Sequence, residues 1–124
     1  MKIALWISQI LLALVFFLTG AIKLFAFDEL AASAPYLADQ PALATFIGIA
    51  ELAGAIGLIL PGLTGVFPFL TTWAAIGVAT ILVLATGLHL MRGEVVHAVV
   101  TVILLALASF VIYGRGFRNE PVSN

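Results

Sequence analysis

Apolar positions along this chain form long runs that are separated by short polar links. An α-helix rises ~1.5 Å per residue, so about 20 apolar residues are needed to cross ~30 Å of hydrocarbon. Four runs reach or approach that length. Each run is apolar around its whole circumference, as is typical of helices embedded in lipid. We therefore predict membrane-spanning helices at residues 3–26, 42–60, 67–90 and 95–113.

Proline and glycine mark the ends of these predicted helices. Pro41 stands where a first helical turn would begin, and proline has no N–H to leave unpaired there. Pro61, followed by glycine, predicts the end of the second helix and a tight turn, and Pro68 predicts the start of the third. Gly93 falls in the short link between the third and fourth helices.

The remaining segments are polar or ambiguous. The long connection from 27 to 40 contains a predicted short interfacial helix at 28–34, with Asp28 as its N-cap. We expect the polar tail from Gly114 to be frayed. Lys2 and the run that follows resemble a secretory signal, but the run is longer than a usual signal core and residues 19–21 form a poor cleavage site. We predict that this helix is retained.

The amino-acid composition, like the long apolar runs, indicates a membrane protein. Apolar residues make up 64% of the 124 positions and charged residues only 9%, far from the roughly one quarter charged that is typical of soluble domains. The fold class that follows is all-α, an integral membrane four-helix bundle that forms one domain over residues 1–124. A net charge of −1 offers no basis for binding nucleic acid. The absence of cysteine excludes disulfides, thiolate metal sites and thiol redox chemistry by this chain.

An even number of spans places both termini on the same side of the membrane. That side carries Lys2, Arg115 and Arg118, whereas the other side carries Arg92 and Lys23. The positive-inside rule counts lysine and arginine, and it favours cytoplasmic termini.

Glu51 is the most informative residue because a charge at mid-bilayer costs about 2.5–3.5 kcal/mol. It lies ten residues into the second run, ~15 Å from its start. Small residues near it on the same helical face would let another backbone approach closely. We therefore predict that Glu51 faces a protein partner. The residues predicted to pack helices closely are Gly20, Gly48, Gly54 and Gly57.

Lys23 is the natural partner for Glu51. It lies near the outer end of the first helix, and helix-rise arithmetic puts the two Cα atoms within ~10 Å in depth. Two alternatives stay open. Lys23 could extend its ammonium group to the interface instead, and Glu51 could be a protonated acid bonded to a neighbouring helix.

A second polar group gathers at the same outer end. His89, Arg92, Glu94 and His97 flank the link between the third and fourth helices. Glu94 precedes His97 by three residues, so the two could share a helical face. The alternative is an ordinary interfacial loop with solvated charges. Both histidines lie at the membrane edge without an obvious third ligand, so we expect neither haem nor a metal ion.

The motifs resemble those of the DoxX and DoxX-like family of small four-helix membrane proteins. The first run, LALVFFLTGAIKLF, ends in Gly-x-x-Lys at Gly20 and Lys23, and the second, IGIAELAGAIGLILPG, carries Glu51 and Gly54 as Glu-x-x-Gly. A third span, the link HLMRGE and a fourth span complete the order. The resemblance implies a four-helix bundle in a prokaryotic cytoplasmic membrane, with Lys23 and Glu51 at the family's recurring polar positions.

The resemblance also suggests functions. Relatives are associated with oxidoreductase assemblies, and others look like assembly chaperones. The first hypothesis is an accessory or quinone-handling subunit of a membrane oxidoreductase, which is not catalytic alone and has no assigned catalytic residue. The alternatives are a non-catalytic membrane scaffold or assembly chaperone, and a small proton-coupled transporter that acts as an oligomer. The expected partners are the lipid bilayer and other membrane or redox proteins, and self-association is left open.

Overall fold

A computed structural model describes residues 2–26, 28, 32, 35, 39–65, 67 and 69–117 of the chain. Within this part lie four long helices and one short one: α1 (Lys2–Phe25), α4 (Pro41–Thr64), α5 (Phe69–Met91), α6 (Val95–Val111) and the π-helix η1 (Ile112–Phe117), which continues α6. Four helices are long and apolar enough to cross a membrane. The predicted all-α membrane bundle is confirmed. The predicted interfacial helix at 28–34, the start signal at Pro68, and Arg118 lie wholly or mostly outside the described residues.

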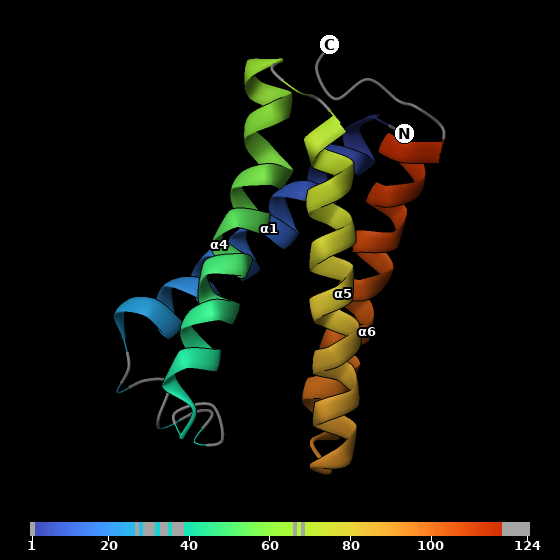
Figure 1. The fold of residues 1–124 in the computed structure, drawn as a ribbon. Helices are drawn as coiled ribbons and strands as arrows, with labels where there is room; N and C mark the ends of the chain where they lie inside the picture. Colours follow the sequence, from blue (N-terminus) through green and yellow to red (C-terminus); the bar gives the residue numbers. More distant parts are fainter. Residues whose placement is uncertain are drawn as a thin grey trace.

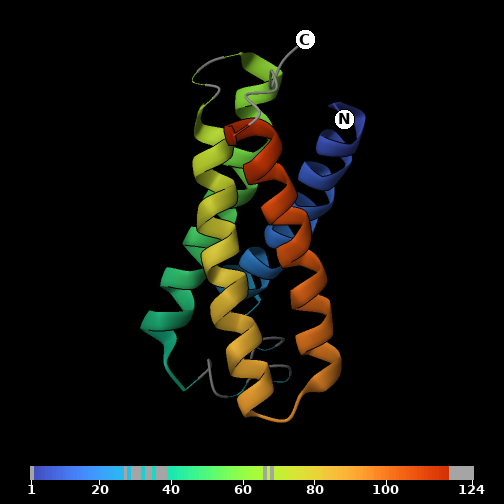
Figure 2. The same ribbon diagram turned by 90° about the vertical axis from the view of Figure 1, so that its right-hand side faces the viewer.

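The bundle consists of two closely packed pairs of helices. α1 packs most extensively against α4, and α5 against α6, while α4 and α5 join the pairs. The start of α1 lies at the same end as η1, as four spans require (Figures 1 and 2). At the opposite end the α1–α4 pair and the α5–α6 pair spread apart (Figure 1). The core between the pairs contains Leu12, Phe16, Leu58, Val78 and Leu82.

The predicted end of the second helix at Leu60 is wrong. α4 runs through Pro61 to Thr64, and Pro61 is buried inside the bundle. Proline removes one backbone hydrogen bond, but packing against neighbouring helices lets membrane helices tolerate it. The helix ends at Gly65, which adopts a positive φ of 72° and donates its N–H to the Pro61 carbonyl at 2.8 Å. That conformation favours glycine, which makes Gly65 the effective stop signal.

The predicted fraying from Gly114 onward is wrong for residues 114–117. These residues belong to η1, and Gly114 and Arg115 are buried. A Cβ atom at position 114 would collide with the Leu5 side chain of α1, so glycine is needed for this close approach. Contact with α1 therefore keeps the polar end of the last span helical.

The four glycines predicted to pack helices all lie at close backbone approaches. A Cβ atom at Gly20 would lie 2.9 Å from the Gly48 carbonyl oxygen, and one at Gly48 would lie 3.0 Å from the Lys23 Cβ. On the other side of α4, a Cβ atom at Gly54 would lie 2.9 Å from the Val78 side chain, and Gly57 is similarly close to α5. Small residues of this kind let membrane helices approach. They hold α4 against α1 at one face and against α5 at another.

Candidate functional site

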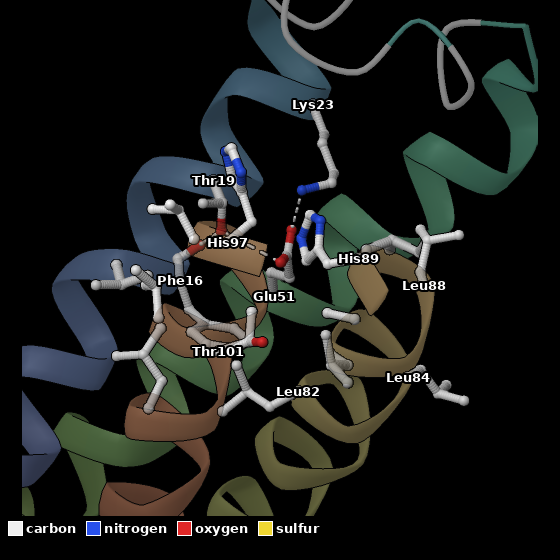
Figure 3. A pocket seen from close by; sticks show the side chains of 17 residues that line it. Phe16, Thr19, Lys23, Glu51, Leu82, Leu84, Leu88, His89, His97 and Thr101 are labelled. Atoms are coloured by element: carbon white, nitrogen blue, oxygen red, sulfur yellow. Dashed lines mark hydrogen bonds and ion pairs between the residues drawn. The ribbon is translucent and has the colours of Figure 1, made fainter. Parts of the chain in front are cut away.

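Lys23 and Glu51 form an ion pair between α1 and α4. The Lys23 Nζ lies 2.8 Å from Glu51 Oε1, and the side chains are only 13% and 7% exposed. The Gly20–Gly48 approach brings the two helices together beside these residues. Lys23 is therefore turned inward toward Glu51, and not toward the interface (Figure 3).

Thr19 provides the second contact to the Glu51 carboxylate. Its hydroxyl donates to Glu51 Oε2 at 3.2 Å. The other oxygen, Oε1, is buried and lies against the Lys23 ammonium at 2.8 Å. The two carboxylate oxygens therefore face two different residues of α1.

The opposite wall is built by α5, α6 and the link between them. The His89 Nδ1 lies 2.9 Å from Glu94 Oε1, and the Arg92 Nε lies 3.4 Å from the same oxygen. The rings of His89 and His97 stack with centroids 5.1 Å apart and an interplanar angle of 25°. Glu94 is the N-cap residue of α6, and its carboxylate contacts His89. The shared helical face of Glu94 and His97 stays a prediction.

Electrostatics at the link favour the charged form of Glu94. The hydrogen bond from His89 lowers the pKa of the Glu94 carboxyl below its ordinary value of 4.5, and the charges of Arg92 and His97 act in the same direction. Desolvation acts against this lowering. Glu94 is therefore a carboxylate near neutral pH, and a carboxylate can only accept hydrogen bonds.

A cavity of about 470 Å³ lies between the two walls. Figure 3 shows Lys23, Glu51, Thr19 and both imidazoles around its polar end, with Phe16 and Leu82 farther along it. Thr101 also lines it and accepts a hydrogen bond from Thr86 at 2.7 Å. The remaining lining is aliphatic and comes from all four long helices: Val15, Ile47, Ile81, Leu84, Ala85, Leu88, Val96, Val100 and Leu104.

Part of the cavity wall also lies on the outside of the bundle within the membrane-spanning segments. Leu84 and Val100 line the cavity and are 69% and 50% exposed. Both lie inside predicted spans, at least five residues from the α5–α6 link. Side chains exposed at that depth face hydrocarbon, so this wall of the cavity borders lipid.

Sequence reasoning missed a second buried polar cluster. It lies at the end of the bundle formed by the start of α1 and by η1, which we call the closed end; the opposite end, which holds the cavity, is the open end. Gln9 of α1 donates through Nε2 to the Leu58 carbonyl at 2.6 Å and accepts from Arg115 Nε at 2.8 Å. The Arg115 guanidinium also lies over the Trp6 ring, 5.7 Å from its centroid. The available signal was Gln9 itself, the one amide side chain within the first apolar run.

The described residues contain no group of three His, Asp or Glu side chains arranged to hold a metal ion. The site is instead a set of hydrogen-bond donors and acceptors at one end of an apolar cavity. Such a site suits an amphipathic organic molecule with a polar head.

Comparison with protein families gives a match over most of the chain. No curated protein and no solved structure is significantly similar to the chain. The family model described as the DoxX-like family matches residues 7–111, a range that includes Lys23, Glu51 and both histidines. The match covers most of the 124 residues and nearly all of the four spans, and the chain therefore belongs to the DoxX-like family.

Proposed function

We propose that this protein is a quinone-handling accessory subunit of a membrane oxidoreductase in a prokaryotic cytoplasmic membrane, with cytoplasmic termini. The observation that carries the proposal is the cavity of about 470 Å³, which has an exposed wall within the spans and its polar groups gathered at one end. Its size falls in the range of roughly 300–1,000 Å³ that is usual for small-molecule sites.

The lining matches the chemistry of a quinone. Lys23 supplies a hydrogen-bond donor for a carbonyl oxygen, and the Glu51 carboxylate supplies an acceptor for the hydroxyl of the reduced form. The aliphatic walls suit a hydrocarbon tail, and the exposed wall at Leu84 and Val100 borders the bilayer from which that tail would enter. In this role Glu51 also relays protons to and from the bound head.

Electron transfer requires a partner. The chain has no cysteine, so it offers neither a thiol nor a cysteine-held cluster as an electron carrier. We infer that another membrane or redox protein oxidises or reduces the quinone, while this subunit binds and orients it. That division of labour is why we do not propose catalysis by this chain alone.

One observation bears on the scaffold alternative. The close-packing glycines of α4 are occupied within the bundle, since Gly48 approaches α1 while Gly54 and Gly57 approach α5. These three glycines therefore do not offer a free docking surface to a partner. The transporter alternative has no comparable observation in its favour, so both alternatives become outcomes of the test.

The test compares two tryptophan variants in lipid nanodiscs. Ala85→Trp places an indole in the cavity, whereas Ala106→Trp places the same group on an exposed position of α6 that does not line it. Mass spectrometry measures the quinone retained after extraction from native membranes. We expect wild type and Ala106→Trp to retain quinone and Ala85→Trp to lose most of it.

Two further variants test the polar end. We expect Glu51→Gln and Lys23→Met to fold and to retain less quinone than wild type. If wild type retains none, or if Ala85→Trp retains as much as Ala106→Trp, the proposal is wrong and the scaffold hypothesis gains support. Native mass spectrometry of the same extract identifies the redox partner that the proposal requires.

A further inference from the structure

Glu94 fixes the hydrogen positions on His89. Because the carboxylate can only accept, the Nδ1 atom that lies 2.9 Å from it must carry a hydrogen. In the neutral imidazole the second nitrogen, Nε2, is then an acceptor, and in the imidazolium Nε2 is a donor. Orientation of a histidine by a carboxylate is a common way to define its tautomer.

The oriented ring lies in the proposed quinone site. His89 lines the cavity, its side chain is only 17% exposed, and Figure 3 shows it beside the Lys23–Glu51 pair. Glu94 lies at the membrane edge in the link between helices and has direct contacts with His89 and Arg92. The His89–Glu94 pair therefore joins the polar end of the cavity to the edge of the membrane.

We propose that the His89–Glu94 pair makes this site select between the oxidised and reduced forms of its quinone according to pH. This inference rests on the proposed function. An imidazolium Nε2–H donates to a quinone carbonyl, which can only accept. A neutral Nε2 accepts from a hydroquinone hydroxyl, which can donate. Acidic conditions then favour quinone, and alkaline conditions favour hydroquinone.

Several charged or titratable groups face His89 from the elements packed around it. Glu94 contacts its Nδ1, and Glu51 of α4 lines the cavity with it. Arg92 in the link lies against Glu94, and Lys23 of α1 also lines the cavity. His97 of α6 stacks on the His89 ring, with the ring centroids 5.1 Å apart.

The experiment measures binding of decylubiquinone and of anaerobically reduced decylubiquinol to the protein in nanodiscs from pH 5.5 to 8.5. We expect the ratio of the two affinities to change by about tenfold across this range, the factor that accompanies gain or loss of one hydrogen bond to a charged group.

His89→Phe and His97→Phe form the matched pair of variants, since each keeps an aromatic ring in the stack and removes one titrating group. We expect His89→Phe to abolish the change in ratio and His97→Phe to retain it. Glu94→Gln can donate as well as accept, so it no longer fixes the hydrogen on Nδ1 and the change in ratio should weaken. In ¹⁵N NMR spectra, the Nδ1–H tautomer of His89 should predominate in wild type and lose that predominance in Glu94→Ala.

The outcomes separate the two proposals. If both forms bind with a ratio that does not vary with pH, the quinone site stands and the selection by His89 is wrong. If the change in ratio survives in His89→Phe and disappears in His97→Phe, His97 is the responsive group and our assignment is overturned. If neither form binds at any pH, both the proposed function and this inference fail.

Discussion

The two ends of this bundle use buried polar residues in opposite ways. At the closed end, Arg115 is 4% exposed and bonds to Gln9, which in turn bonds to the Leu58 carbonyl. At the open end, Lys23 and Glu51 are similarly buried, but they face a cavity of about 470 Å³. Helix α1 supplies residues to both clusters: Trp6 and Gln9 at the closed end, and Thr19 and Lys23 at the open end.

The difference separates polar groups that hold helices together from polar groups that are presented to a ligand. At the closed end, the Gln9 amide is engaged by both its nitrogen and its oxygen, and it links α1 with α4 and η1. At the open end, Lys23, Glu51 and the imidazoles line the cavity. Burial alone therefore does not identify a functional site, whereas burial beside a cavity does.

The largest effect is expected from Gln9→Leu. This change leaves the buried Arg115 guanidinium without its Gln9 acceptor and removes the bond to the Leu58 carbonyl, so we expect the free energy of unfolding to fall by about 3 kcal/mol. Reversible unfolding in mixed micelles measures it. Ser8→Ala is the control, because that hydroxyl bonds only to the Ala4 carbonyl of its own helix. Equal effects of the two substitutions would remove the distinction between the ends.

Gly20→Ala tests the approach of α1 to α4 that supports the open end. Its Cβ would lie 2.9 Å from the Gly48 carbonyl oxygen, a backbone atom that cannot move aside alone, so we expect a loss of about 2 kcal/mol. Gly77→Ala is the matched control, since no atom lies within 4 Å of a Cβ there. The same unfolding assay should show Gly77→Ala to be neutral or slightly stabilising, and a loss equal to that of Gly20→Ala would contradict this account.

Glu51→Gln should have a smaller effect on stability than either change. The amide preserves the shape of the side chain, and Lys23 lies near enough to the helix end to extend toward water, so we expect a loss of about 1 kcal/mol or less. Quinone retention should fall much further. If Glu51→Gln instead unfolds the protein as Gln9→Leu does, the pair at the open end is structural and the comparison between the two ends fails.

The smallest effect concerns Glu94 and acid. The pKa of Glu94 is lower in the folded than in the unfolded protein, chiefly because of the His89 hydrogen bond. Glu94 therefore stabilises the fold at pH values above its unfolded-state pKa, and this contribution is lost as the pH falls through its folded-state pKa. We expect the difference in stability between wild type and Glu94→Gln to be constant near neutrality and to shrink below pH 4.5. Thermal unfolding at several pH values measures this difference in stability. A difference that grows in acid would show that folding does not lower the pKa of Glu94.

The open end was more accessible to sequence reasoning than the closed end. Lys23 and Glu51 are charges inside apolar runs, and helix-rise arithmetic alone brings them to similar depth. Gln9 and Arg115 are 106 positions apart, and Arg115 stands in a segment that reads as a polar tail. Nothing local connects them, because their contact depends on how the last helix crosses the first.

The sequence by itself determined four apolar spans, their lipid surroundings and the cost of placing Lys23 and Glu51 among them, because hydropathy and helical rise act over a few turns. Tertiary structure decided that α4 continues through Pro61, that Glu94 bonds to His89, and that the helix pairs spread to enclose a cavity. Those features depend on crossing angles and on contacts between distant segments. Backbone approaches at single glycines set these contacts, and a one-dimensional pattern does not encode them.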